Sequence, residues 1–185
     1  QDISLATTEY AIPAYYVIMP AEVSSNLARY DGIRYGESRF EEATSLQEIY
    51  TKSRAAGLGP EVKRRIMLGT YVLSGGYYDA YYAQARSMQT KIRRDFDAAF
   101  EEVDAILTPT TPHTAFTAGE KSDPLSMYLE DIFTVAVNLS GNPAISIPAT
   151  PERDRLPIGF QLIGNHFDEQ TILTLGHAWD RASRI

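Results

Sequence analysis

The sequence predicts an α/β fold in which helices predominate and about three short strands form part of a sheet. Three short apolar runs are typical of buried strands, and at least six longer segments repeat apolar residues at helical spacing. A chain of 185 residues has the length of one domain, and no linker or internal repeat divides it, so a single piece is expected over residues 1–185. Three strands are too few for a sheet that helices cover on both faces. We therefore expect the chain to be part of a longer protein.

The first helix is expected to begin near Thr7 or Thr8, because either hydroxyl can cap a helix N-terminus. Its apolar pattern continues until Gly32, which is expected to end it. Pro20 falls inside this pattern and lacks the backbone N–H that a helix interior requires. We expect it to kink the helix or to split it into two pieces.

Two further helices have clear start and stop signals. Ser45 and Glu48 have the spacing of a capping box, and the helix that they open is expected to stop at Gly57. Pro60 is well placed as the first residue of a third helix, which extends to about Ser74.

A long amphipathic helix is predicted over residues 77–103. One stripe carries its apolar side chains, which are Tyr81, Ala85, Met88, Ile92, Phe96 and Phe100. We interpret this stripe as a packing face.

The C-terminal part of the sequence alternates strands and helices. Residues 105–108 are predicted to be a buried strand, and residues 109–124 a loop of a length that is more often functional or mobile than merely connective. Asp123 can cap a helix that extends to about Leu139.

Two more strands are expected near residues 144–149 and 158–164, with a charged turn at residues 151–155 between them. Their continuous apolar runs suit the interior of a sheet. Asp168 can cap the final helix.

The composition argues against several classes of protein. A net charge of −7 is the opposite of the basic footprint that nucleic-acid binding usually leaves. The absence of cysteine excludes disulfides and thiolate metal sites, and the 3 histidines have no ligand spacing, so no metal site is expected. The uncharged run at residues 132–151 contains prolines and asparagines, so we expect no membrane span. The absence of cysteine fits a reducing cytoplasm, so we expect a cytoplasmic protein.

Five segments carry a resemblance to a known family. Residues 9–36, 61–82, 95–112, 123–148 and 156–164 resemble the C-terminal half of the GatA family, the amidase-signature subunits of glutamyl-tRNA(Gln)/aspartyl-tRNA(Asn) amidotransferases. The resemblance implies the C-terminal portion of an amidase-signature fold, which has a mixed central sheet flanked by helices.

The catalytic motif of that family does not occur in this sequence. Its members carry a Gly/Ser-rich stretch of the GGSSGGS type and an upstream Lys, which supply a Ser–cis-Ser–Lys triad, and residues 1–185 contain no such stretch. Ser24, Ser25 and Ser74 lack the Gly-rich setting that exposes a nucleophilic hydroxyl, and His113 belongs to no triad pattern. We therefore expect no catalytic residue here, and residues 1–185 correspond to the substrate-side half of an amidase domain.

The resemblance implies a binding site for glutamine. A free amino acid requires a guanidinium for its α-carboxylate and a carboxylate for its α-ammonium, and a phenol is a common third contact. At the matching motif positions these are Arg65, Asp131 and Tyr15. Adjacent residues on a helix point about 100° apart, so only one of each neighbouring pair faces a pocket. We prefer Arg65 to Arg64 and Tyr15 to Tyr16; the alternative is that this basic cluster is a solvated face.

The function that the resemblance implies is hydrolysis of glutamine to supply ammonia for the amidation of Glu-tRNA(Gln) or Asp-tRNA(Asn). The sequence has no phosphate-binding loop, so no cofactor is expected in this chain. In the family, ATP and Mg²⁺ are used by the partner subunit GatB, which also holds the charged tRNA, and GatC is the third subunit. The alternatives are part of another amidase-signature hydrolase, acting on a small or aryl amide, and a non-catalytic interaction piece with an exposed apolar face.

Overall fold

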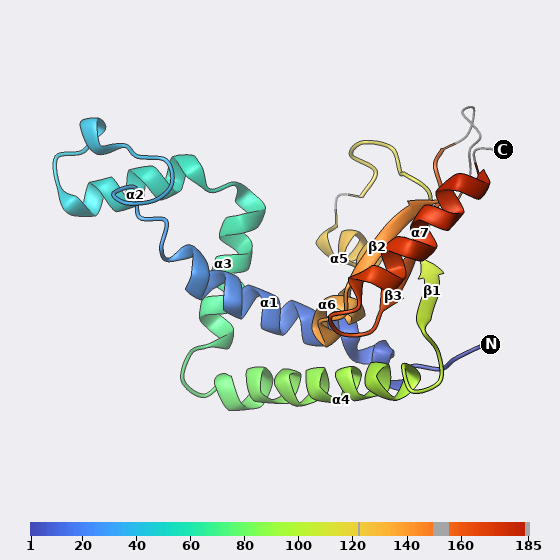
Figure 1. The fold of residues 1–185 in the computed structure, drawn as a ribbon. Helices are drawn as coiled ribbons and strands as arrows, with labels where there is room; N and C mark the ends of the chain where they lie inside the picture. Colours follow the sequence, from blue (N-terminus) through green and yellow to red (C-terminus); the bar gives the residue numbers. More distant parts are fainter. Residues whose placement is uncertain (122, 150–155, 184–185) are drawn as a thin grey trace. The chain divides into compact units, whose positions relative to one another are not determined.

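The computed structural model describes residues 1–121, 123–149 and 156–183, and the chain separates into two compact units. Unit 1 contains Gln1–Tyr15 and Ser87–Ile185, and unit 2 contains Tyr16–Arg86. The single-piece organisation stays a prediction, and the charged turn expected at residues 151–155 lies outside the described residues. The structure is rich in helices and has one three-stranded sheet, so the predicted α/β class is confirmed (Figure 1).

The first helical element is the 3-10 helix η1 (Ala6–Tyr10). The predicted cap at Thr7 or Thr8 is wrong, because both residues lie inside η1 and no side chain caps it. Both the backbone N–H and the hydroxyl of Thr7 donate to a carboxylate oxygen of Asp95, at 2.8 and 2.7 Å. The hydroxyl of Thr8 donates to the Leu5 carbonyl at 2.7 Å. A distant carboxylate has replaced the local cap, which a sequence pattern cannot anticipate.

Helix α1 (Ala11–Leu27) is continuous through Pro20, so of the two expected outcomes the split does not occur, and the kink stays a prediction. It also ends five residues before Gly32, the stop that the sequence predicted. Gly32 instead forms a bend with a φ of 78°, and its N–H donates to the Tyr35 carbonyl at 3.2 Å. Glycine is favoured there because other residues rarely adopt a left-handed conformation.

Unit 2 contains four further helical elements, of which two were predicted as separate helices. They are η2 (Phe40–Glu42), α2 (Leu46–Gly57), α3 (Pro60–Val72) and the π-helical turn η3 (Tyr78–Tyr82). The Ser45 hydroxyl accepts the N–H of Glu48 at 3.2 Å, as predicted. The Glu48 carboxylate accepts the N–H of Thr44 at 2.9 Å, one residue before the N-cap N–H of Ser45 that a capping box uses. The predicted end at Gly57 and start at Pro60 are confirmed.

Helices α1 and α3 approach each other closely at Gly69. A Cβ added there would lie 1.8 Å from the carbonyl oxygen of Pro20 and 2.8 Å from the Ser24 hydroxyl oxygen. Gly69 is buried, and Pro20 is among the most deeply buried residues of the chain. The two backbones therefore meet with no room for a side chain between them.

Helix α4 (Ala83–Ala99) is shorter at both ends than the predicted helix at residues 77–103. Its predicted packing face is confirmed where the helix is regular, because Ala85, Ile92 and Phe96 are all buried. Tyr81 is 50% exposed, since it belongs to the preceding π-helical turn, where the spacing of the stripe changes.

The sheet has the strand order β1-β3-β2 and is antiparallel throughout. Its strands are β1 (Ala105–Pro109), β2 (Ala144–Pro148) and β3 (Gly159–Gly164). The central strand β3 is the buried one. Strand β1 was predicted to be buried, but Leu107 is 65% exposed because β1 is an edge strand of this sheet.

Helix α7 (Glu169–Ser183) packs against β2 and β3 and forms the second layer of unit 1 (Figure 1). Asp168 caps it as predicted, because its carboxylate accepts the N–H of Thr171 at 3.3 Å. The core between the layers contains Ile147, Leu162 and Ile172.

The helix predicted from Asp123 to Leu139 is three separate pieces, namely α5 (Pro124–Tyr128), the 3-10 helix η4 (Leu129–Asp131) and α6 (Val135–Ser140). The cap is confirmed, since the Asp123 carboxylate accepts the N–H of Ser126 at 2.9 Å. The interruption follows from Thr134, whose N–H and hydroxyl both donate to the Asp131 carbonyl, at 2.9 and 3.1 Å. This local turn replaces the i to i−4 bonds of an α-helix. None of the helices in the described ranges is long and apolar enough to cross a bilayer.

We expect Gly69→Ala to destabilise the packing of α1 on α3. Overpacking of this kind typically costs about 1–3 kcal/mol, which exceeds the gain of up to ~1 kcal/mol that alanine brings to a helix. Chemical denaturation monitored by circular dichroism measures the change. Gly75→Ala is the matched control, since a Cβ there meets nothing within 4 Å, and it should leave stability unchanged. Equal stabilities of the two variants would contradict the close approach.

Candidate functional site

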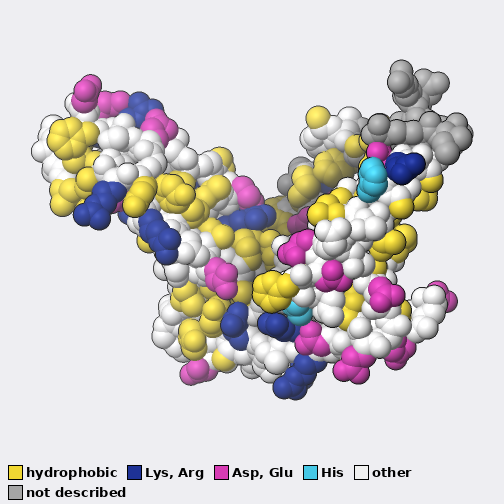
Figure 2. Space-filling view, viewed as in Figure 1, with side chains coloured by type: hydrophobic (Ala, Val, Ile, Leu, Met, Phe, Trp, Pro, Cys, Tyr) yellow, Lys and Arg dark blue, Asp and Glu magenta, His cyan; other side chains and the backbone are white. Residues whose placement is uncertain are grey.

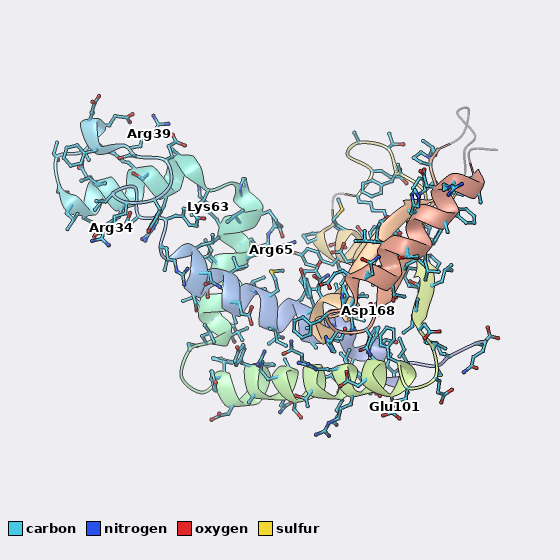
Figure 3. All side chains as sticks on the ribbon, viewed as in Figure 1. Arg34, Arg39, Lys63, Arg65, Glu101 and Asp168 are labelled. Carbon is cyan, nitrogen blue, oxygen red and sulfur yellow. The ribbon has the colours of Figure 1, made fainter. Side chains whose placement is uncertain are left out.

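Arg65 projects from α3 (Figure 3), and its side chain contacts α1. Its Nε atom is 2.9 Å from the Glu61 Oε1 atom, one helical turn earlier. The guanidinium carbon lies 5.9 Å from the centre of the Tyr16 ring, and Nη1 is 3.8 Å from the Met19 sulfur. A carboxylate, an aromatic face and a thioether from two helices therefore surround this cation.

The neighbouring Arg64 has a different environment. Its Nη1 atom forms an ion pair with the second oxygen of Glu61, and 49% of its side chain is exposed, against 30% for Arg65. Arg65 is thus the more enclosed of the two and the one with contacts to α1. Its choice over Arg64 as a ligand-binding residue stays a prediction, which this geometry favours.

The two candidate tyrosines are adjacent on α1, and both are partly buried. Tyr16, the residue that the sequence ranked second, provides the ring beside Arg65. Tyr15 belongs to unit 1, whereas Tyr16 and Arg65 belong to unit 2. The structure therefore brings Arg65 and Tyr16 together within one unit, and the role of Tyr15 stays a prediction.

Asp131 is the last residue of η4 in unit 1 and is partly buried. Its backbone carbonyl closes the turn with Thr134, which fixes the main chain from which the carboxylate extends. Its predicted meeting with Arg65 around one ligand stays a prediction, because the two residues belong to different units.

The preceding residue, Glu130, ties the predicted loop at residues 109–124 to η4. Its carboxylate forms an ion pair with Lys121 and lies 3.2 Å from the His113 ring nitrogen Nδ1. The Lys121 ammonium also lies 4.9 Å from the centre of the Phe116 ring. The hydrogen bond from Lys121, and secondarily that from His113, lower the pKa of Glu130 below its ordinary 4.5.

A neutral polar cavity of about 410 Å³ occurs in unit 1. Six uncharged polar side chains contribute to its lining, namely Thr110, Thr134, Asn138, Asn142, Ser146 and Gln161. The Gln161 amide is fixed because it donates to the Thr108 hydroxyl at 2.9 Å and to the Phe133 carbonyl at 2.7 Å. Hydroxyls and amides without a formal charge suit a neutral polar group rather than an ion. This cavity was not predicted from the sequence, since its lining residues come from four separate segments.

The hydroxyls of the three serines discussed above are all engaged by backbone carbonyls, that of Ser74 with Tyr71 at 2.7 Å. The hydroxyls of Ser24 and Ser25 both donate to the Ala21 carbonyl, at 2.8 and 3.2 Å. Within the described residues, no group of three or more His, Asp or Glu side chains could hold a metal ion.

Unit 2 exposes apolar side chains on α3. Met67 is 73% exposed, and Leu68 and Tyr71 are also exposed. Figure 2 shows hydrophobic side chains interspersed with Lys and Arg over the helices of this unit. Such an arrangement is typical of a surface that another protein segment covers.

The family to which the chain belongs follows from its sequence. A profile described as Amidase matches residues 1–173. The chain belongs to the amidase family. Among curated relatives, the GatA subunit of the glutamyl-tRNA(Gln) amidotransferase of Novosphingobium aromaticivorans is 58% identical over 185 residues, and that of Carboxydothermus hydrogenoformans is 59% identical over 182 residues. These alignments cover 100% and 98% of this amidase-family chain but only 37% of each relative.

Solved structures of amidases share its fold. The crystal structure of the corresponding GatA protein from Thermotoga maritima superposes with a TM-score of 0.62 at 40% identity, covering 92% of this amidase-family chain and 32% of that protein. A bacterial aryl acylamidase of the amidase signature family gives a TM-score of 0.65 at 19% identity, covering 99% of this chain and 36% of the other. The latter likeness concerns the fold alone.

We expect Lys121→Ala to raise the pKa of Glu130 toward its ordinary 4.5, because the largest influence that lowers it is removed. NMR titration of the Glu130 carboxyl carbon measures this change. His113→Ala should raise the pKa less. Since the folded-state pKa lies below 4.5, the ion pair stabilises the folded state above pH 4.5 and is lost as the pH falls through the lowered pKa. An equal pKa in the parent and in Lys121→Ala would contradict this pairing.

Proposed function

We propose that this chain is the glutamine-binding part of a glutaminase subunit that supplies ammonia for the conversion of Glu-tRNA(Gln) to Gln-tRNA(Gln), with Asp-tRNA(Asn) as an alternative acceptor. The observation that carries the proposal is the identity of 58%, along the entire chain, to a GatA protein of a glutamyl-tRNA(Gln) amidotransferase. The geometry of Arg65 supports it, because an enclosed guanidinium beside an aromatic ring suits the α-carboxylate of an amino acid.

Each candidate residue has a distinct task in this proposal. Arg65 pairs with the α-carboxylate of glutamine, Asp131 pairs with the α-ammonium, and the Tyr15 hydroxyl donates a hydrogen bond to the substrate. These contacts hold the amino-acid end, so that the carboxamide lies at a defined place relative to a nucleophile. In the amidase-signature family that nucleophile is a serine, which forms an acyl-enzyme and releases ammonia, and water then releases glutamate.

The proposed partners are the GatB and GatC subunits. Ammonia passes to GatB, where ATP and Mg²⁺ would supply the activation of the side-chain carboxylate of the glutamyl or aspartyl residue on the tRNA, so this chain needs no cofactor of its own. The process is cytoplasmic because it serves translation.

An interaction-only role is the second candidate, and the exposed apolar side chains on α3 favour it. Under that proposal the chain is ordered against another protein segment and binds no glutamine. A small or aryl amide as the substrate has less support, since an arginine paired with a carboxylate suits a zwitterion better.

The purified 185-residue chain should release no ammonia from glutamine, because it lacks the Gly/Ser-rich stretch of the family. A coupled glutamate dehydrogenase assay measures the release, with a boiled sample as the control. A rate clearly above this control would contradict the prediction and would direct attention to Ser24 and Ser25.

We expect Arg65→Ala and Asp131→Ala each to lower kcat/KM for glutamine, when they are made in the complete GatA protein within its complex. The loss corresponds to about 2–5 kcal/mol of transition-state stabilisation, since each variant leaves a desolvated charge without its partner. Steady-state amidation of tRNA measures this effect. Arg64→Ala is the matched control and should be mild.

Amidation with ammonium chloride in place of glutamine should survive in the Arg65 and Asp131 variants, because ammonia bypasses the glutamine site. If Arg64→Ala abolishes glutamine use and Arg65→Ala does not, the choice between the neighbours is wrong. If none of these variants affects glutamine use, the pocket assignment is wrong and the interaction-only role is favoured.

A further inference from the structure

Glu61 occupies a special position relative to the two arginines of α3. It lies in the first turn of the helix, and its two carboxylate oxygens are divided between Arg65 and Arg64. Oε1 accepts from the Nε atom of Arg65 at 2.9 Å. The family resemblance gives this residue no role. Its side chain is 43% exposed, so Glu61 is not a core residue.

The bond to Nε restricts how the Arg65 guanidinium can turn. A guanidinium has one edge formed by Nε and an Nη atom and another formed by the two Nη atoms, and either edge can pair with a carboxylate. Glu61 binds at the Nε atom, which restrains the guanidinium from the side of its own helix. The Tyr16 ring and the Met19 sulfur limit the same group from the side of α1.

We propose that Glu61 is a positioning residue for glutamine, which holds the Arg65 guanidinium in the orientation that pairs with the α-carboxylate of the substrate. The inference rests on the function proposed above and adds a residue that determines how tightly the substrate is held. An arginine that is already fixed loses less conformational freedom when the ligand binds, so glutamine binds more tightly.

The role of Glu61 predicts a specific kinetic signature. Its loss leaves the charge of Arg65 in place but frees the rotation of the side chain, so binding of glutamine weakens while the chemical step does not change. We expect Glu61→Ala to raise KM for glutamine roughly tenfold and to leave kcat unchanged. This is the size of effect expected when the charge-assisted hydrogen bond that orients Arg65 is lost while Arg65 itself remains. Glu61→Gln retains an oxygen that can accept from Nε, so it should recover most of the affinity.

The experiment uses the complete GatA protein within its complex, with glutamine and, separately, ammonium chloride as nitrogen donors. Glu48→Ala is the matched control, because Glu48 is also a first-turn glutamate in unit 2 with an i,i+4 ion pair, to Lys52 at 3.1 Å. It should leave KM for glutamine unchanged. Amidation with ammonium chloride should be unchanged in every variant, which shows that each one is folded and assembled.

A double-variant cycle separates this inference from the function on which it rests. If Glu61 acts through Arg65, adding Glu61→Ala to Arg65→Ala causes no further rise in KM. A further rise, or an unchanged KM in Glu61→Ala when Arg65→Ala raises it, overturns the positioning role and leaves the glutamine site intact. An unchanged KM in Arg65→Ala itself overturns the proposed site and the positioning role together. If Glu61→Ala loses the ammonium-dependent reaction, Glu61→Gln provides the decisive comparison: a tenfold rise in its KM overturns the rescue that the proposal requires, and a KM near that of the parent supports it.

Discussion

The close approach of Gly69 to the Pro20 carbonyl is the contact on which the arrangement of unit 2 depends. Arg65 lies one helical turn before Gly69 on α3, and Tyr16 lies one turn before Pro20 on α1, so each pair shares a face of its helix. When the two backbones meet at Gly69 and Pro20, the guanidinium and the ring one turn away come within reach of each other. A larger residue at position 69 would separate the helices and, with them, the cation from its aromatic neighbour.

This contact also accounts for the continuity of α1 through Pro20. A proline in a helix interior removes one backbone hydrogen bond. Pro20 is fully buried and its carbonyl lies next to Gly69 of α3, and this packing is not part of a local sequence pattern. By contrast, the helix starts at Ser45, Asp123 and Asp168 were predicted correctly, because each depends on a side chain and a backbone N–H only a few residues apart. The start at Pro60 was also predicted correctly, because proline needs no N–H partner at the first position of a helix.

The candidate site shows the same division between local and tertiary information. The i,i+4 spacing of Glu61 and Arg65 was present in the sequence, and charge patterning alone could have identified this ion pair. The proximity of Tyr16 to Arg65 could not have been predicted locally, since it requires the crossing of α1 and α3. The helix break at Thr134 depends on a hydrogen bond between residues only three positions apart, so it is encoded locally. It was not predicted, because the apolar periodicity of residues 123–139 favoured one continuous helix. The neutral cavity of unit 1 depends on four segments that the fold alone assembles.

Both edge strands of the described sheet end in proline. Pro109 terminates β1 opposite Phe160, and Pro148 terminates β2 opposite Gly159, so the two residues lie at the same end of the sheet. Proline cannot donate a ladder hydrogen bond, which makes this end a poor template for another strand. Any strand that enlarges the sheet, whether from the same polypeptide or from a neighbour, must therefore find its donors earlier along β1 or β2. The two prolines therefore disfavour edge-to-edge association with another chain at that end of the sheet.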